Sequence, residues 1–98
     1  MFVRIVKLTI KNEEVDSFMR FFEKVKETVR NQEGCTFLEL YRDRHTSNVF
    51  FTYSYWDSEE TLNAYRYSEA FGEIWPYLKT LFQCKAEAWS VDKLFTLK

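Results

Sequence analysis

The chain has 98 residues and a mass of 12.0 kDa, which leaves room for one domain with one hydrophobic core and excludes a multidomain enzyme. Hydrophobic residues make up 46% of the sequence and charged residues 30%, with two Gly and one Pro, so the composition is typical of a folded domain. The net charge of -1 lacks the positive field that nucleic-acid-binding proteins use, and we therefore expect no nucleic-acid partner.

The first part of the chain is predicted to form a strand and then a helix. Residues 2–10 alternate in a way that is typical of a strand with one mostly apolar face. Asn12 offers an N-cap for a helix. Apolar residues then recur at steps of three and four from Val15 to Val29, which predicts an amphipathic helix that ends before Gly34.

A β-hairpin is predicted next. Apolar residues are frequent over residues 35–43, and residues 49–56 are almost all aromatic or β-branched. The polar segment 44–48 lies between them and supplies the turn. The two strands are therefore expected to pair as antiparallel neighbours.

Two helical pieces and a last strand complete the pattern. Asp57, with Glu60 three residues on, resembles a capping box and predicts the start of a helix. Ser68 can cap a second helical piece, in which Pro76 either kinks the helix or lies near its first turns. Residues 86–97 alternate again and predict a last strand.

The order strand, helix, strand, strand, helix, strand predicts an α+β protein of the ferredoxin-like βαββαβ type, with helices on one face of a four-stranded antiparallel sheet. No linker divides the chain, so we expect a single domain over residues 1–98. In the third strand Tyr53 points to one face while Phe50 and Trp56 point to the other, so both faces are apolar. Because helices cover only one face, we predict that the other packs against a second copy in a homodimer.

Aromatic residues make up 19% of the sequence, more than one small core can hold, so part of this ring area is expected in a pocket or a subunit interface. Such a pocket suits a small, flat aromatic ligand that stacks on rings and is oriented by phenol hydroxyls or a carboxylate. Either face of the sheet could hold it. The polar candidates for the pocket are Tyr53, Tyr55, Tyr65, Tyr67, Glu39 and Arg66.

Glu39 is the clearest catalytic candidate of this set. It lies between Phe37 and Tyr41 on its strand face, and a carboxylate among rings is a stronger base than one in water, so it could take a proton from a phenol. The alternative is an ion pair at the strand edge with a neighbouring Arg or Lys. For Tyr65 and Trp75, the helical spacing is compatible both with a helix core and with pocket lining.

The sequence shows no pattern for a metal or a nucleotide cofactor. His45 is the single histidine and lies in the predicted hairpin turn, where a solvated surface role is the simplest interpretation. Gly34 and Gly72 are the only glycines, so no Gly-rich phosphate loop is present. Cys35 and Cys84 are interpreted as small buried hydrophobes. We therefore predict no metal and no cofactor.

Targeting and membrane signals are also missing from the pattern. Met1 is followed by Phe2, Val3 and Arg4, without a basic segment, an apolar run and a small-residue cleavage site. No stretch approaches the roughly 18 apolar residues of a membrane-spanning helix. These observations predict a cytoplasmic protein with reduced thiols and no membrane association.

The segment from Phe50 to Phe71, together with Gly34-Cys35 at the start of the second strand, resembles the antibiotic biosynthesis monooxygenase (ABM) family. The shared features are a strand that ends in Trp, a helix start rich in Ser and Glu, and a Ser after an aromatic residue with a Phe three positions beyond it, here Ser68 and Phe71. The resemblance implies a dimeric α+β barrel. In characterised members it also implies oxygenation of quinols or polyketide-like aromatics without metal or flavin, because an electron-rich phenolate itself reduces O2.

The first functional hypothesis is therefore a cofactor-independent monooxygenase that acts on a small hydroxylated aromatic or quinol. Glu39 or Tyr65 would assist proton removal as the catalytic residues. The substrate-binding residues would be Tyr53, Ser68, Phe71 and Trp75.

Three alternatives compete with this hypothesis. A non-catalytic dimeric module that binds a hydrophobic aromatic metabolite would use the same pocket. The haem-degrading branch of the family uses an Asn, a Trp and an axial His, whereas the corresponding positions here hold Val6, Tyr65 and Trp75, and Trp cannot ligate iron. An RNA-recognition domain shares the element order, but residues 49–53 lack the basic and glycine positions of its signature.

Overall fold

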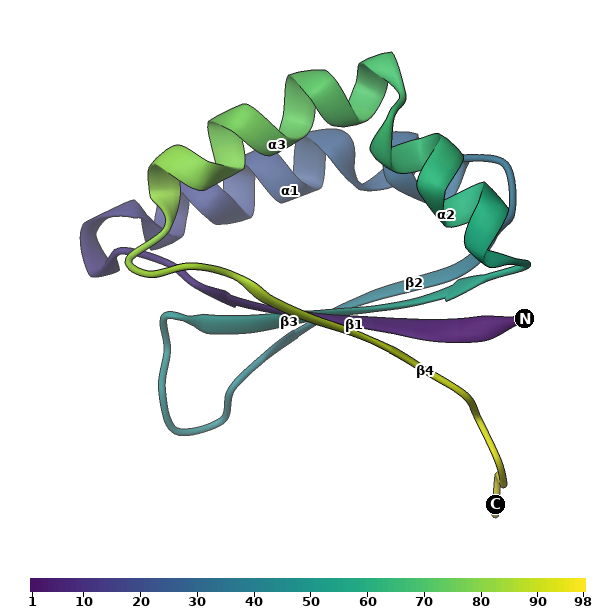
Figure 1. The fold of residues 1–98 in the computed structure, drawn as a ribbon. Coiled ribbons are helices and arrows are strands. Elements are labelled where there is room, and N and C mark those ends of the chain that lie inside the picture. Colours follow the sequence, from purple (N-terminus) through teal and green to yellow (C-terminus); the bar gives the residue numbers. More distant parts are fainter.

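In the computed structural model, which describes residues 1–98, all the helices lie on one face of a four-stranded sheet (Figure 1). The elements along the chain are β1 (Phe2–Thr9), the 3-10 helix η1 (Asn12–Glu14), α1 (Val15–Arg30), β2 (Cys35–Arg42), β3 (Val49–Trp56), α2 (Glu59–Arg66), α3 (Glu69–Leu81) and β4 (Glu87–Val91). None of the helices has the length and apolar character of a membrane span. The architecture confirms the predicted α+β fold of the ferredoxin-like type, with helices on one face.

The strands follow the order β2-β3-β1-β4, and every neighbouring pair is antiparallel. β1 and β3 form the centre, paired from Phe2 opposite Trp56 to Thr9 opposite Val49. This order interleaves two βαβ units, as in other ferredoxin-like folds. β2 and β4 therefore form the two edges of the sheet.

Two clusters of buried side chains hold the helices on the sheet. The first joins the strands to α1 and α3 and consists of Leu8, Ile10, Phe18, Phe50 and Leu81. The second lies under α2 and consists of Phe2, Cys35, Trp56 and Leu62. Each fully buried large apolar side chain stabilises a fold by roughly 1.5–3 kcal/mol, so these contacts fix the helical layer on the sheet.

The starts of the helices differ in part from the prediction. Ser68 accepts a hydrogen bond from an amide in the first turn of α3 at 3.2 Å and caps that helix as predicted. The predicted Asp57 cap of α2 is wrong by one residue, because Ser58 accepts the bond from the Thr61 amide and the two form the capping box. The predicted Asn12 cap is also wrong, since Asn12 lies inside η1 and neither η1 nor α1 has a side-chain cap.

The last strand is shorter than the predicted segment 86–97. β4 pairs antiparallel with β1, and its last residue, Val91, lies opposite Val3, where β1 has almost no residues left to pair with. The chain then leaves the sheet on the side opposite the helices (Figure 1). We call residues 92–98 the tail.

The two cysteines occupy different environments. Cys35 is buried in the second cluster as predicted, and burial raises the pKa of its thiol. Cys84 is exposed, contrary to the prediction. It lies in the connection between α3 and β4, which runs over the surface and has no periodic pattern that would turn its side chain inward.

Gly34 precedes β2 with a φ of +86°, and a Cβ at this position would overlap the side chain of Thr61. We predict that Gly34→Ala lowers the free energy of unfolding by about 1–3 kcal/mol, because an L residue is strained at this φ and would displace Thr61 from the capping box. Urea unfolding followed by circular dichroism measures the change.

Gly72→Ala is the matched control, because a Cβ at Gly72 meets nothing within 4 Å. It lies inside α3, where Ala in place of Gly should stabilise the protein by about 0.5–1 kcal/mol. Equal stability of Gly34→Ala and the wild type would contradict the strain argument.

Candidate functional site

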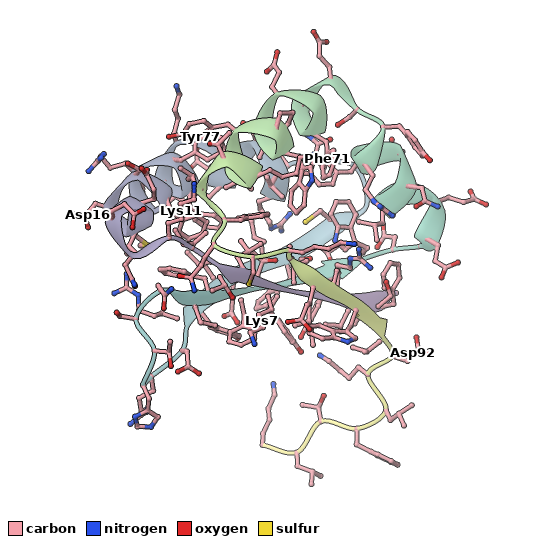
Figure 2. All side chains as sticks on the ribbon, turned by 60° about the vertical axis from the view of Figure 1, so that its left-hand side comes forward. Lys7, Lys11, Asp16, Phe71, Tyr77 and Asp92 are labelled. Atoms are coloured by element: carbon pink, nitrogen blue, oxygen red, sulfur yellow. The ribbon has the colours of Figure 1, made fainter.

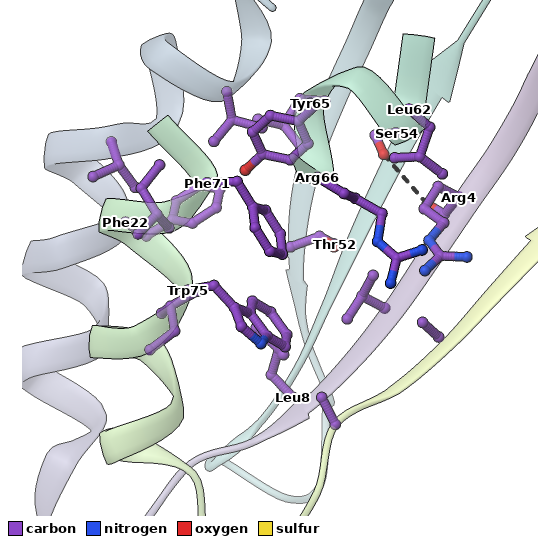
Figure 3. A pocket seen from close by; sticks show the side chains of 18 of the residues that line it. Arg4, Leu8, Phe22, Thr52, Ser54, Leu62, Tyr65, Arg66, Phe71 and Trp75 are labelled. Atoms are coloured by element: carbon purple, nitrogen blue, oxygen red, sulfur yellow. Dashed lines mark hydrogen bonds between the residues drawn. The ribbon is translucent and has the colours of Figure 1, made fainter. Parts of the chain in front are cut away.

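A cavity of about 330 Å³ lies between the helices and the sheet and borders both core clusters (Figure 3). Of its 20 lining residues, 16 are hydrophobic. This size and lining are typical of small-molecule sites, which are mostly apolar with a few polar groups. Figure 2 shows Phe71 on this side of the sheet and Lys7 on the opposite side.

Aromatic rings along one side of the cavity contact one another in succession. Tyr65 stacks on Trp56 with 5.4 Å between ring centroids and meets Phe71 edge-on at 5.2 Å. Phe71 stacks in turn on Trp75 at 5.5 Å with an interplanar angle of 12°. We call Trp56, Tyr65, Phe71 and Trp75 the aromatic wall. The spacing of four residues puts Phe71 and Trp75 on the same side of α3, so both face the cavity.

Ser68 links the two helices that carry this wall. Its hydroxyl donates to the Tyr65 carbonyl oxygen at 2.6 Å and accepts from the Phe71 amide at 3.2 Å. The side chain does not line the cavity. Ser68 therefore fixes the backbone positions of Tyr65 and Phe71, the two wall residues on either side of the junction.

The Tyr65 hydroxyl is a polar group of the aromatic wall that is free to bind a ligand. It makes no hydrogen bond within the protein. Burial, followed by the nearby Cys35 thiol, raises the pKa of Tyr65 to about 12. The hydroxyl therefore keeps its proton at neutral pH and can donate a hydrogen bond, whereas it is a poor proton acceptor.

Arg4 and Arg66 line the cavity together, from β1 and from the end of α2 (Figure 3). Arg4 donates to the Ser90 hydroxyl at 2.9 Å. Burial lowers the pKa of the Arg4 guanidinium below its ordinary value, and the charge of Arg66 lowers it further. Arg66 was among the predicted pocket residues, but Arg4 was missed. The sequence feature that could have indicated Arg4 is its position as the one charged residue on the face of the first strand that also carries Val6 and Leu8.

Glu39 and Tyr53 lie on the uncovered face of the sheet and not in this cavity. They are opposite one another in the β2–β3 pair. The Tyr41 hydroxyl donates to the Glu39 carboxylate, and the Phe37 and Tyr53 rings meet edge-on at 6.2 Å. The predicted site residues thus form two groups separated by the sheet: Tyr65, Phe71 and Trp75 line the cavity, with Ser68 behind them, while Glu39 and Tyr53 belong to the other face.

His45 lies in the turn between β2 and β3 and is exposed. Its backbone amide donates to the Asp43 carboxylate at 3.0 Å, which closes the turn. No group of three or more His, Cys, Asp and Glu side chains is gathered as metal ligands are.

The comparison with protein families identifies one family. The model of the family described as antibiotic biosynthesis monooxygenase matches residues 1–75. No curated protein matches the chain. The family match confirms the resemblance that the sequence motifs indicated.

Solved structures share the fold over nearly the whole chain. A conserved protein from Methanosarcina mazei Go1 is 25% identical, with a TM-score of 0.87 over 96% of this chain and 94% of that chain. A structure described as antibiotic biosynthesis monooxygenase is 19% identical, with a TM-score of 0.89 over 96% of this chain and 99% of that chain. The protein PA3566 from Pseudomonas aeruginosa is 20% identical, with a TM-score of 0.84 over 96% and 94%.

The alkaline stability of the protein should depend on Tyr65. Its folded pKa of about 12 lies above the ordinary 10.0, so folding favours the neutral hydroxyl; this contribution is complete below pH 10 and is lost as the pH rises towards 12. We predict that the wild type loses roughly 2 kcal/mol more stability than Tyr65→Phe between about pH 9 and about pH 11.5. Urea unfolding at each pH measures both.

Tyr67→Phe is the control for the loss of a phenol, because the Tyr67 side chain is 90% exposed. Its stability should follow that of the wild type across the same pH range. Parallel curves for the wild type and Tyr65→Phe would contradict the raised pKa.

Proposed function

The chain belongs to the antibiotic biosynthesis monooxygenase family, and on that premise we propose that it oxygenates a small hydroxylated aromatic compound with O2 in the helix-side cavity. The observation that carries the proposal is the aromatic wall, which offers ring faces to a ligand in a cavity of about 330 Å³. A planar substrate can stack on such faces while its hydroxyl group meets a polar side chain.

The proposed reaction converts an aromatic C–H group into a carbonyl group. A phenol with a free para position and O2 give a quinone and water, so one oxygen atom enters the ring and the other leaves as water. The substrate supplies all the electrons that reduce O2, and the reaction consumes no external reductant. The tasks of the protein are then to hold and orient the substrate and to keep bulk water away from the reacting carbon.

The side chains of the cavity have distinct roles in this proposal. Phe71 and Trp75 stack on the substrate ring and set its plane. Tyr65 donates a hydrogen bond to a substrate oxygen, where negative charge develops as the phenol ionises. Because its raised pKa keeps the proton on the hydroxyl, Tyr65 acts as a donor and not as the base.

The uncovered face is proposed as the interface of a homodimer, the assembly that members of this family generally form. Its aromatic and aliphatic side chains include Val3, Ile5, Phe37, Tyr41, Phe51, Tyr53, Tyr55, Trp89 and Val91. A face with this many apolar and aromatic side chains, among which the charged residues are Lys7, Glu39 and Glu87, favours association, and a twofold axis places the same patch on both copies. Glu39 and Tyr53 are then interface residues.

The tail extends this apolar surface. Lys93 donates to the Tyr55 hydroxyl at 2.7 Å, so the tail starts against the uncovered face and leaves a hollow of about 730 Å³ beside it. Its side chains Leu94, Phe95 and Leu97 are 81%, 88% and 95% exposed. A second copy would cover them.

One observation favours the alternative of a binding module without turnover. No carboxylate and no histidine lines the cavity, so the protein places no general base beside a bound phenol. In that case the cavity would bind an aromatic metabolite and return it unchanged. Oxygen consumption separates the two functions.

We expect the metal-stripped protein to consume O2 above the autoxidation rate with at least one member of a panel of phenols and naphthols whose para position is free. Tyr65→Phe should lower kcat/KM by roughly 10- to 100-fold, because it removes a hydrogen bond to the developing charge. Tyr67→Phe, at the exposed residue that follows α2, should retain the wild-type rate. Thermal stabilisation by panel compounds without oxygen uptake would contradict the monooxygenase and favour the binding module.

Sedimentation velocity should show a species of twice the 12.0 kDa chain mass. Tyr53→Arg introduces a charge into the uncovered face and should raise the dimer dissociation constant by roughly 30-fold or more. Tyr67→Arg adds the same charge at a side chain that is 90% exposed and should sediment like the wild type. A wild-type protein that is monomeric at all concentrations would contradict the interface.

A further inference from the structure

The fold itself gives no reason for two guanidinium groups in the helix-side cavity. Arg4 is on the side of β1 that carries Val6 and Leu8, where the other cavity-lining residues of that strand are apolar. A charge in such surroundings loses part of its hydration, which destabilises it unless a partner compensates. The position therefore calls for a partner.

Neither arginine has that partner within the protein. The ion pairs of the structure are Lys7 with Glu87 and Lys26 with Glu23, so no carboxylate lies within 4.0 Å of Arg4 or Arg66. Each guanidinium group carries five N–H donors. Arg4 uses a donor for the Ser90 hydroxyl, and Arg66 makes no side-chain hydrogen bond.

The two positive charges also act on one another. The charge of Arg66 disfavours the charged form of Arg4, which shows that the groups are close enough to repel. Figure 3 shows both guanidinium groups at the same end of the cavity, beside the aromatic wall and not within it. An anion bound between the two guanidinium groups would relieve this repulsion and accept hydrogen bonds from their free N–H groups.

We propose that Arg4 and Arg66 bind an oxyanion carried by the aromatic ligand, so that the cavity selects an anionic aromatic over its neutral analogue. The oxyanion is a ring carboxylate or an ionised phenol, since either accepts hydrogen bonds from the planar guanidinium fork. This proposal rests on the proposed function, because it names the substrate class of the same cavity. Arg4, held by Ser90, and Arg66 would direct the anionic end of the ligand while the aromatic wall takes its rings.

The test uses three bicyclic probes that do not depend on turnover: 2-naphthoate, its neutral isostere 2-naphthamide, and 2-naphthol. Isothermal titration calorimetry of the full chain measures their dissociation constants at about pH 7 and, for 2-naphthol, also near pH 10, where Tyr65 keeps its proton. We expect 2-naphthoate to bind roughly tenfold or more tightly than 2-naphthamide, as expected for charge-assisted hydrogen bonds.

Substitutions assign the preference to the arginine pair. Arg66→Met and Arg4→Met should bring the ratio of the two dissociation constants close to one, and Arg4→Lys should retain part of the preference. Arg66 is exposed at the end of α2, so its variant tests the proposal even if Arg4→Met does not fold. Arg44→Met, in the exposed turn between β2 and β3, is the matched control and should bind like the wild type.

Each outcome decides the proposal. If the wild type prefers 2-naphthoate and the arginine variants lose this preference, the ligand is a carboxylate. If the wild type binds 2-naphthol more tightly at the higher pH and the arginine variants do not, the ligand is an ionised phenol. The proposal is overturned if charged and neutral probes bind equally, or if the preference survives in both Arg4→Met and Arg66→Met. The proposed function is then still tested by oxygen consumption. Failure of all three probes to bind also overturns the proposal, and the oxygen measurement then tests the proposed function by itself.

Discussion

Successive residues of β3 point to opposite faces of the sheet, and both sets include large aromatic side chains. The side with Phe50 and Trp56 is covered by helices and contains both core clusters. The side with Tyr53 and Tyr55 is left open, because the chain supplies helices for one layer only. This alternation places a ligand-sized cavity on one side of the sheet and a surface rich in aromatic side chains on the other. In the proposed function, chemistry and assembly therefore use different faces of the same strand.

Much of the fold could be predicted from the sequence, because each element carries its own periodicity and the order of the elements restricts the topology. The starts of the helices were less certain, since Asp57 and Ser58 are equally good caps and only the backbone conformation distinguishes them. The length of β4 is set by its pairing register with β1, because the strand ends where β1 has almost no further residues to pair with. This is a long-range contact that local sequence does not show.

The candidate site was predictable only in part. Phe71 belongs to the family motif, which is a local signal, whereas the helical spacing of Trp75 is compatible both with a helix core and with pocket lining. Glu39 was grouped with Tyr65 because both are polar groups among rings, but the strand parity of Glu39 assigns it to the opposite face. The sequence does not identify Arg4 as a cavity residue, because a charged residue in a strand normally faces water. The tertiary structure shows that its side of β1 faces the cavity.

The cavity also leaves the interior hollow. Only 13 of the 98 residues are buried, and the two core clusters border a space that side chains of ordinary size do not fill. Small residues such as Ala86 and Ala88 line it, and larger ones there would improve the packing. The same two positions therefore link ligand size to stability: a larger side chain there would fill interior space and, by the same volume, reduce the room for a ligand.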